Sequence, residues 1–311
     1  MTVTVLVPVY GVEKYIAKCA ESLFAQTYPQ IEYVFCDDCT PDRSIEVLQE
    51  VMEKYPERKD HVHIVRQEHN SGIGAVRARL LQEVRTDTFC FVDSDDFMPA
   101  EAIETLVNRM AETGKDIIDG AYADYYDGKV SEPMHRSHCS DEKFLRRVLC
   151  LNLERHCVWG RLYKTSVLQR LPDMFFDGIN CSEDYCATAR ISAVATRAWT
   201  DSLVYYYRTN LSGTYTDTLS EKNMLSTLRA MAQVLRFYRM RGHLPMAMEI
   251  GVLHMYRECH KAAIRPEVAD RELKYVPEHF RAKLLYSMLC NDKLYKLGDF
   301  LYRIIRAIVV L

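Results

Sequence analysis

Short apolar stretches alternate with helical patterns over residues 2–122, and this alternation constrains the fold more than any other feature. The apolar stretches are residues 2–9, 31–36, 61–66, 88–92 and 116–122, and the helical patterns are residues 12–26, 42–55, 74–84 and 99–113. Continuous apolar strands between helices are typical of mostly parallel sheets that helices cover on both faces. We therefore predict an α/β fold with a mostly parallel, helix-covered sheet.

The pattern is less regular after residue 122, where Asp127 and Gly128 predict a turn. A loop over residues 172–182 and a strand over residues 197–208 are expected in this half of the chain. Further helices are expected at residues 142–151, 165–171 and 182–194 and throughout the region after residue 220.

The charge balance excludes one class of function. Lys and Arg total 40 against 43 for Asp and Glu, and a net charge of −3 does not suit a nucleic-acid binder. The 11 cysteines are odd in number and scattered, with one C-x-x-C at Cys36 and Cys39, which favours an intracellular protein without structural zinc. With no signal-peptide pattern and no long apolar window, we expect a cytoplasmic protein.

Polar clusters follow the predicted strands, at the edge where parallel sheets bind ligands. The strongest cluster contains Asp93, Asp95 and Asp96, directly after a buried strand. Carboxylates this close repel one another and are costly to desolvate unless a cation neutralises them. Mg²⁺ or Mn²⁺ held by one or two carboxylates and a diphosphate would meet that need. The alternative is an acidic loop that caps the helix beginning at Pro99.

Two more clusters are candidate nucleotide contacts. Asp37 and Asp38 could bind a base or ribose, or could form a turn and N-cap before the next helix. The segment from Asn70 to Arg77 superficially resembles G-x-G-x-x-G, but Arg77 fills the third glycine position and the segment follows the third strand. Arg77 suits a base or phosphate contact, and the alternative is a solvated arginine.

Glu183 and Asp184 begin a predicted helix far along the chain. Ser182 could cap this helix, and acidic residues in its first turn would favour the helix dipole. The functional alternative is that a carboxylate here acts as a general base.

Taken together and in this order, these motifs resemble those of the family 2 glycosyltransferases of bacterial polysaccharide type. The resemblance covers about residues 2–215. Three positions depart from the family pattern, with Gly11 in place of Asn, Cys39 in place of Gly and Ala78 in place of Asn. The matching segments are Val5–Tyr15, Ser22–Tyr28, Asp37–Ser44, Asn70–Arg77, Asp93–Asp96, Trp159–Lys164, Glu183–Asp184 and Tyr205–Arg208 with Ser212.

The resemblance implies a GT-A fold, the nucleotide-diphospho-sugar transferase fold. The helical pattern after residue 220 adds a C-terminal all-helical extension. The same resemblance implies a catalytic domain over residues 1–215, whose nucleotide-sugar-binding half is 1–122 and whose acceptor-side half is 123–215. The helical region is then 216–311. The implied activity is inverting transfer of a sugar from a nucleotide-diphosphate donor, usually UDP, to a hydroxyl of a glycan or lipid-linked acceptor in surface polysaccharide synthesis.

The resemblance also assigns roles to residues. Asp95 would bind Mn²⁺ or Mg²⁺, and Asp184 would be the base that deprotonates the acceptor. The implied donor-binding residues are Pro8, Val9, Tyr10, Asp38, Asn70, Arg77, Asp93, Ser94 and Arg208.

Other functions remain as alternatives. An inactive sugar-nucleotide-binding module would keep Asp38 and Asp93 but lose the base, whereas Asp184 is present. A Mg²⁺-dependent phosphohydrolase would place its D-x-D after the first strand, and here it follows the fourth. A nucleotidyltransferase would need a triphosphate-binding loop rich in Gly, Arg and Lys after the first strand, where Gly11 is flanked by Tyr10 and Val12.

The C-terminal segment carries an apolar stripe with heptad-like spacing and a basic cast. The stripe could pack within the chain, pair with a second copy in a homodimer, or lie on anionic lipid as a peripheral membrane contact at the inner face of the cytoplasmic membrane. The stripe is formed by Leu294, Leu297, Leu301, Ile304, Ile308 and Leu311, and its basic residues are Lys293, Lys296, Arg303 and Arg306.

Overall fold

The computed structural model describes residues 1–151, 153–209, 220–291 and 294–310. Ser212, Lys293 and Leu311, which were part of the sequence predictions, lie outside these ranges. The chain forms two compact units. Unit 1 comprises residues 1–138, 157–178 and 194–214, and unit 2 comprises residues 139–156, 179–193 and 215–311.

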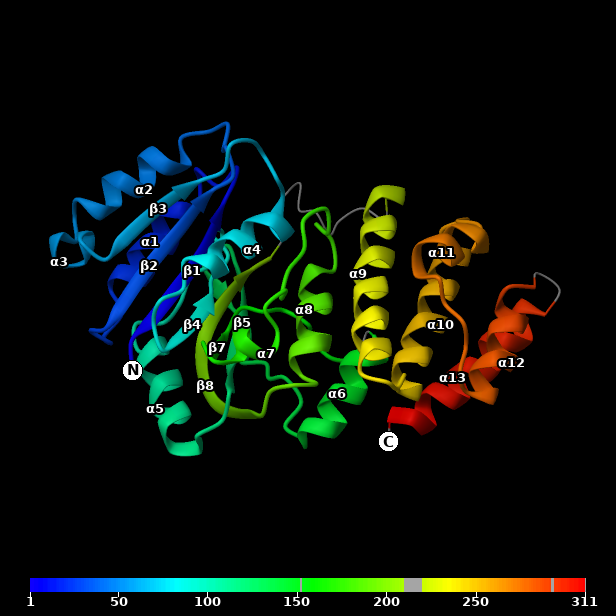
Figure 1. The fold of residues 1–311 in the computed structure, drawn as a ribbon. Coiled ribbons are helices and arrows are strands. Elements are labelled where there is room, and N and C mark those ends of the chain that lie inside the picture. Colours follow the sequence, from blue (N-terminus) through cyan, green and yellow to red (C-terminus); the bar gives the residue numbers. More distant parts are fainter. Residues whose placement is uncertain (152, 210–219, 292–293, 311) are drawn as a thin grey trace. The chain divides into compact units, whose positions relative to one another are not determined.

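Unit 1 contains one mixed, mostly parallel sheet (Figure 1). Its strands lie in the order β3-β2-β1-β4-β7-β5-β6, and β8 pairs with β5. The pairs β1–β2, β1–β4, β2–β3 and β5–β8 are parallel, whereas β7 runs antiparallel to β4 and β5. The strands are β1 (Val3–Val9), β2 (Ile31–Asp37), β3 (Val62–Arg66), β4 (Thr88–Phe91), β5 (Ile117–Tyr126), β6 (Lys129–Val130), β7 (Arg161–Lys164) and β8 (Arg197–Arg208).

Helices cover both faces of this sheet, which confirms the predicted fold class. Apolar residues of β1, such as Val5 and Val7, share one buried cluster with α1, α2 and α5, while α4 lies against β1 and β2 (Figure 1). The helices of unit 1 are α1 (Ile16–Phe24), α2 (Ser44–Met52), α3 (Pro56–Lys59), α4 (Ile73–Gln82), α5 (Ala102–Thr113) and α7 (Val167–Arg170).

The alternation predicted over residues 2–122 is confirmed, but the helix expected to begin at Pro99 begins at Ala102. The helix predicted for residues 42–55 ends at Met52 and is followed by the short α3, because Pro56 opens a new turn. The sequence patterns did not predict β7, which begins with Arg161. That side chain is buried, and its Nε lies 2.8 Å from Oδ1 of Asp119.

Asp119 is the centre of a buried ion cluster in the sheet. Its Oδ2 also accepts a hydrogen bond from Nη1 of Arg197 at 2.7 Å. Burial alone would raise the pKa of Asp119, but Arg161, Arg136 and Arg197 outweigh burial and lower that pKa. The cluster joins β5, β7 and β8, so buried charged residues hold this part of the sheet together with apolar ones such as Leu162 and Val204.

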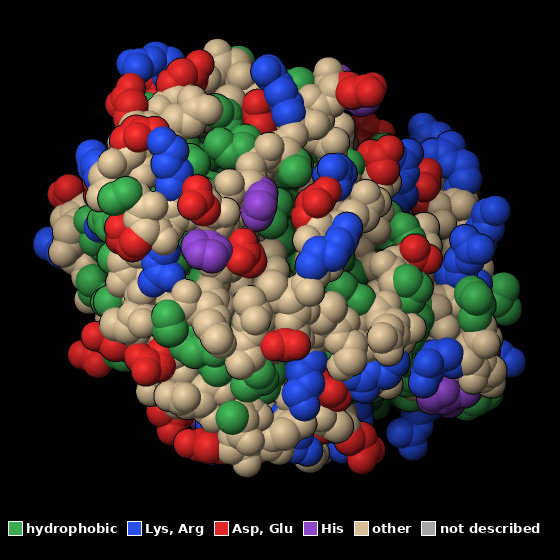
Figure 2. All heavy atoms as spheres, turned by 60° about the vertical axis from the view of Figure 1, so that its left-hand side comes forward, with side chains coloured by type: hydrophobic (Ala, Val, Ile, Leu, Met, Phe, Trp, Pro, Cys, Tyr) green, Lys and Arg blue, Asp and Glu red, His purple; other side chains and the backbone are tan. Residues whose placement is uncertain are grey.

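In the residues that the structure describes, unit 2 consists of helices and loops, as predicted for the region after residue 220. Figure 1 shows α9 and α10 side by side, and α12 packs against α13. Acidic and basic side chains are interspersed over most of the face of the molecule in Figure 2, in keeping with the small net charge. The helices of unit 2 are α6 (Asp141–Leu149), α8 (Glu183–Ile191), α9 (Glu221–Met240), α10 (Met246–Lys261), α11 (Pro266–Leu273), α12 (Phe280–Leu289) and α13 (Tyr295–Val310).

Most of the described apolar stripe on α13 is exposed and does not pack within unit 2, although Leu301 is half-buried. Leu297 and Ile308 are 51% and 57% exposed, and Leu294 and Ile304 are exposed as well. The buried side of α13 instead carries Tyr302. Packing of the stripe on the catalytic domain stays a prediction.

Candidate active site

Three polar segments meet at one edge of the sheet in unit 1. Strand β1 lies between β2 and β4 and runs parallel to both. The segments at or just after the ends of these strands, Pro8–Tyr10, Asp37–Asp38 and Asp93–Asp96, therefore share the edge. Tyr10 is exposed there, while Val9 is buried.

Asp38 is buried and positions the loop that carries Asn70. Its Oδ1 accepts a hydrogen bond from the Ser71 amide at 2.7 Å, and its Oδ2 accepts one from the Gly72 amide at 2.9 Å. Asn70 itself is exposed. The structure thus gives Asp38 a positioning role, and its direct contact with a base stays a prediction.

Arg77 is buried in α4, so the alternative of a solvated arginine is wrong. Its Nη2 donates to Oδ1 of Asp93 at 2.8 Å. Its guanidinium lies 6.0 Å from the ring centre of Phe91 and 5.8 Å from that of Phe175. The two aromatic rings help to position the Arg77 guanidinium. Its charged hydrogen bond in turn holds the Asp93 carboxylate in place.

Asp96 is almost completely buried and fastens the acidic loop to β8. Its Oδ2 accepts a hydrogen bond from the Tyr205 hydroxyl at 2.8 Å, and its Oδ1 accepts one from the Arg208 amide at 2.7 Å. The Tyr205 hydroxyl also accepts a hydrogen bond from the Asp93 amide at 3.0 Å. Burial, and then the charges of Asp95 and Asp93, raise the pKa of Asp96 well above its ordinary value.

Arg208 adds a positive charge beside this loop. Its Nε donates to the backbone carbonyl of Asp95 at 2.8 Å. The guanidinium lies 5.0 Å from the ring centres of both Tyr15 and Tyr125. Arg208 is therefore held next to Asp95 by a hydrogen bond and by aromatic rings.

The carboxylates of Asp93 and Asp95 fit a hard divalent cation. Burial, followed by the charge of Asp93, raises the pKa of Asp95 to about 6. The ligand atoms that these side chains offer are all oxygens, and their negative charge is incompletely balanced. Mg²⁺ and Mn²⁺ prefer ligands of this kind. Ser94, between the two, is buried. Binding of either ion through Asp95 stays a prediction.

The Tyr205 hydroxyl provides a test of this loop. Tyr205→Phe should lower the free energy of unfolding by about 1–3 kcal/mol, because a buried Asp96 oxygen and the Asp93 amide each lose a partner. We expect affinity for Mn²⁺ to fall about 10-fold because the loop is less well positioned. Urea denaturation and Mn²⁺ titration measure the two effects. Tyr206→Phe is the matched control, and equal effects of both substitutions would contradict the proposed role.

Two departures from the family pattern lie at positions with left-handed backbone. Gly11 has φ of 67° and Cys39 has φ of 53°. Glycine adopts this conformation without steric cost and asparagine tolerates it, so the Gly11 departure is conservative. Cys39 instead carries a side chain where the family's glycine would relieve strain, although its Sγ contacts the Gln67 carbonyl oxygen at 3.0 Å.

Cys39→Gly should therefore stabilise the protein. Removing the Cβ relieves a conformation that costs a non-glycine residue about 1–2 kcal/mol, and glycine's extra freedom in the unfolded chain returns part of that gain. We expect a net increase of about 0.5–1 kcal/mol in the free energy of unfolding, measured in urea. Cys39→Ala keeps the strained Cβ and should give no increase. A decrease for Cys39→Gly would show that the thiol contact outweighs the strain.

The predicted base lies in unit 2. Asp184 is in the first turn of α8 and is half-buried. Ser182 occupies the N-cap position with φ of 63°, but its side chain makes no capping hydrogen bond. The Ser182 hydroxyl instead lies 2.9 Å from that of Thr227. The interpretation of Ser182 as a side-chain cap is wrong, and the role of Asp184 stays a prediction.

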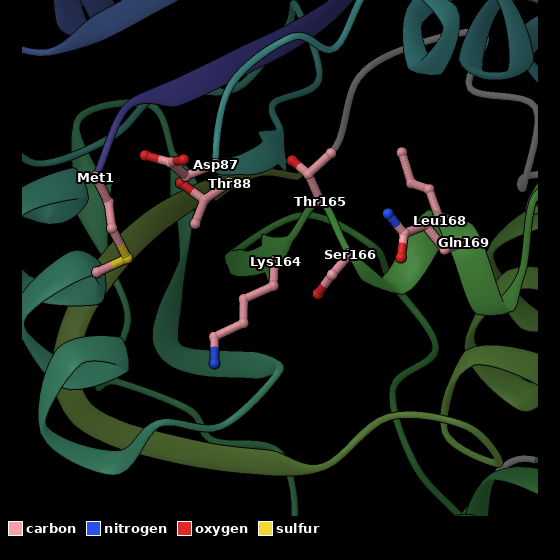
Figure 3. A pocket seen from close by; sticks show the side chains of 8 residues that line it. All are labelled: Met1, Asp87, Thr88, Lys164, Thr165, Ser166, Leu168 and Gln169. Carbon is pink, nitrogen blue, oxygen red and sulfur yellow. The ribbon is translucent and has the colours of Figure 1, made fainter.

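A cavity of about 760 Å³ lies at the other end of the sheet (Figure 3). It is lined by Met1, Thr88 at the start of β4, and Lys164 at the end of the antiparallel β7. Lys164 Nζ donates to the Gly114 carbonyl at 2.6 Å, so this cation already has a partner. The cavity therefore lies away from the carboxyl ends of the parallel strands and does not coincide with the candidate site.

Sequence reasoning missed Tyr205 and Asp96 as a pair. They are separated by 109 positions, and the antiparallel bridge between the neighbouring residues Phe97 and Tyr206 brings them together. The run Tyr205–Arg208 at the end of a predicted strand was the available signal. Trp159 stacks on Tyr205 with ring centres 4.5 Å apart. This aromatic contact helps to position the Tyr205 hydroxyl that binds the acidic loop.

The sequence matches the profile of glycosyl transferase family 2 over residues 4–171. The chain belongs to glycosyl transferase family 2. It is 28% identical over 271 residues to glycosyltransferase GlyA of Streptococcus pneumoniae, which covers 82% of this chain and 37% of GlyA. This chain spans 37%, 61% and 40% of the lengths of three of its curated relatives.

Two solved glycosyltransferase structures share the GT-A fold seen here. The structure of Staphylococcus aureus TarS residues 1–349 in complex with UDP has a TM-score of 0.66 at 19% identity, covering 100% of this chain and 89% of that one. The mannosyltransferase PcManGT of Pyrobaculum calidifontis, in complex with GDP-Man and Mn²⁺, has a TM-score of 0.56 at 16% identity, covering 99% and 85%. Within the ranges that the structure describes, no helix combines the length and hydrophobicity needed to cross a bilayer.

Proposed function

We propose that this member of family 2 is an inverting glycosyltransferase that moves a sugar from a UDP-sugar to a hydroxyl of a glycan or lipid-linked acceptor in polysaccharide synthesis. One observation carries the proposal. Asp93 and Asp95 follow a central parallel strand, and Arg77, Tyr205 and Arg208 hold their loop in place. The UDP bound in the TarS structure and the name of TarS, a poly(ribitol-phosphate) β-N-acetylglucosaminyltransferase, support a UDP donor and a polymer as the acceptor class.

Donor binding would use the edge described above. Asp38 shapes the loop of Asn70, and these residues with Arg77 and the Pro8–Tyr10 backbone would surround the uridine. Asp95, with Asp93 beside it, would hold Mn²⁺ or Mg²⁺, and the Mn²⁺ in the mannosyltransferase structure supports this. The ion, when bound, would neutralise the diphosphate as a leaving group. Asp93 would also reach ribose or sugar hydroxyls, and Arg208 would face the diphosphate.

Inversion requires a single in-line displacement. A carboxylate oxygen of Asp184 would take the proton of the acceptor hydroxyl while the acceptor's hydroxyl oxygen forms a bond to the anomeric carbon of the donor sugar. The bond from that carbon to the UDP oxygen breaks in the same step, and UDP leaves with the electron pair. Under this proposal residues 1–122 serve the donor and residues 123–215 serve the acceptor.

A donor screen tests this function directly. UDP release from a panel of UDP-sugars, with Mn²⁺ and with or without a polysaccharide acceptor, should show one preferred donor and acceptor-stimulated release. Donor binding without release would support the inactive binding module. Release of inorganic phosphate instead of UDP would support the phosphohydrolase.

We further propose that the exposed stripe of α13 pairs with a second copy of the chain. Two basic residues of this segment already have partners within the chain, because Arg303 pairs with Asp299 and Arg306 donates to the Leu151 carbonyl. They are therefore less available to an anionic lipid surface, which favours pairing with a second copy. Deleting residues 293–311 should convert a dimer to a monomer in light scattering. Loss of liposome binding without a change in mass would favour a peripheral membrane contact at the cytoplasmic face.

A further inference from the structure

We propose that His135, His138 and Asp201 form a second metal site in unit 1, one that takes a borderline divalent ion of the Zn²⁺ class. Among the described residues, this is the group of His, Cys, Asp and Glu side chains whose ligand atoms come together, all within 4.8 Å of one another. Nδ1 of His135 and Nε2 of His138 each lie 3.7 Å from Oδ1 of Asp201.

These separations are close to those of a metal-ligand set. Ligand atoms about 2.0–2.2 Å from a tetrahedral Zn²⁺ ion are about 3.3 Å apart. All three side chains are at the surface, so small rotations would bring the nitrogen and oxygen atoms to that spacing. Water would complete the coordination at the exposed side, as it does in sites with three protein ligands.

The donor chemistry separates this site from the acidic loop. Two imidazoles and one carboxylate suit Zn²⁺, Co²⁺, Ni²⁺ or Cu²⁺, whereas the all-oxygen set of Asp93 and Asp95 suits Mg²⁺ or Mn²⁺. Asp201 also precedes Arg208 by seven residues on β8, which is roughly 20 Å along an extended strand. One ion could not serve both groups.

An irregularity in β8 directs Asp201 toward the histidines. Asp119 pairs with Trp199, and the next pair is Ala121 with Leu203, so β8 contains two more residues than β5 between these points. Gly120 faces this irregularity, where an added Cβ would lie 2.1 Å from Cγ2 of Val204. Bulges of this kind re-aim side chains and are over-represented next to functional sites.

The histidine segment is already held in place around the proposed site. The His138 ring stacks on Trp199 with centres 4.8 Å apart and planes 10° apart. Between the two histidines, the buried Arg136 donates to the Trp159 carbonyl at 2.7 Å, and Arg197 donates to the Ser137 carbonyl at 2.9 Å. These contacts limit the freedom that the imidazoles must lose on binding, which favours affinity. A bound ion would tie this segment to β8.

A Zn²⁺ titration of the chelator-treated full chain tests the site. The experiment uses competition with a chromophoric chelator in the presence of excess Mg²⁺, which keeps the acidic loop occupied. His135→Gln and Asp201→Asn should each weaken binding of one Zn²⁺ equivalent by more than about 10–100-fold, the range seen for residues that only support ligands. Wild-type protein should also gain roughly 5 °C in melting temperature with Zn²⁺ in about 100-fold excess over Kd, and the variants should not.

The chain offers a matched control. His61 and His63 both lie near Glu32, at 2.9 and 3.4 Å, but these residues are not among the groups whose ligand atoms converge. His61→Gln/His63→Gln should therefore leave Zn²⁺ affinity unchanged. Co²⁺ absorption distinguishes nitrogen and oxygen ligands from the chain's free thiols, because thiolate ligation adds a charge-transfer band. Equal affinity in wild-type and Asp201→Asn proteins, or a thiolate band that persists in His135→Gln, would overturn the proposal.

Discussion

Asp95→Ala should abolish sugar transfer, with turnover falling by roughly 10³-fold or more. The diphosphate of the donor would lose the ion that neutralises it, and stabilisation of a leaving group by a metal contributes several kcal/mol. Asp93→Asn should weaken donor binding as well, because Asp93 pairs with Arg77 and lies beside Asp95. Initial rates of UDP release with Mn²⁺ measure both effects.

The control for Asp95→Ala is Asp60→Ala, which removes an exposed carboxylate on the turn before β3. Its turnover should match the wild type. Urea denaturation should show that Asp95→Ala remains folded, because the contacts of Tyr205 and Arg208 with the loop use Asp96 and backbone atoms rather than the Asp95 side chain. Full activity of Asp95→Ala in the presence of a chelator would contradict the metal assignment.

Asp184→Asn should lower kcat by about 10²–10⁴-fold while leaving UDP binding intact. The change is nearly isosteric but removes the atom that would accept the acceptor's proton, and general base catalysis contributes this range. Glu183→Gln is the matched control, because Glu183 shares the first turn of α8 and should affect positioning more than chemistry. Near wild-type kcat for Asp184→Asn on a true acceptor would place the base elsewhere.

The sheet was predictable because its central strands are continuous apolar runs. Residues such as Val5 and Phe35 are fully buried, and no polar residue interrupts the hydrophobic signal for long. Strand β7 was not predictable in this way, because it has only four residues and begins with the charged Arg161, which is buried in an ion pair with Asp119. Two charged residues 42 positions apart leave no periodic signal in a single sequence.

The position of the candidate site was predictable from the sequence, but the contacts that support it were not. The rule that ligands bind at the carboxyl ends of parallel strands identified Asp38 and Asp93, and the structure brings their segments to one edge. The supporting contacts were not predictable, because Arg77 reaches Asp93, and Tyr205 reaches Asp96, only through tertiary packing.

For the C-terminal helix, the apolar stripe was predictable but the face that is buried was not. Heptad spacing indicated an apolar face on residues 294–311, but α13 buries other positions. Gly298 lies close to Met288, where an added Cβ would be 2.9 Å from its Cβ, and Asp299 pairs with Arg257. A small residue and an ion pair therefore contribute to this contact beside the buried Tyr302, and neither of them adds to a hydrophobic pattern.

Calorimetric titration with UDP is the measurement that most directly tests the site, because it needs no acceptor and no knowledge of the sugar. Wild-type protein should bind UDP in the presence of Mn²⁺, bind it at least about 10-fold more weakly with a chelator, and bind GDP more weakly than UDP. Asp95→Ala should bind UDP weakly and equally with or without Mn²⁺. UDP affinity that is the same in wild type and Asp95→Ala, or that does not respond to Mn²⁺ in the wild type, would contradict a metal-assisted nucleotide-sugar site at this edge of the sheet.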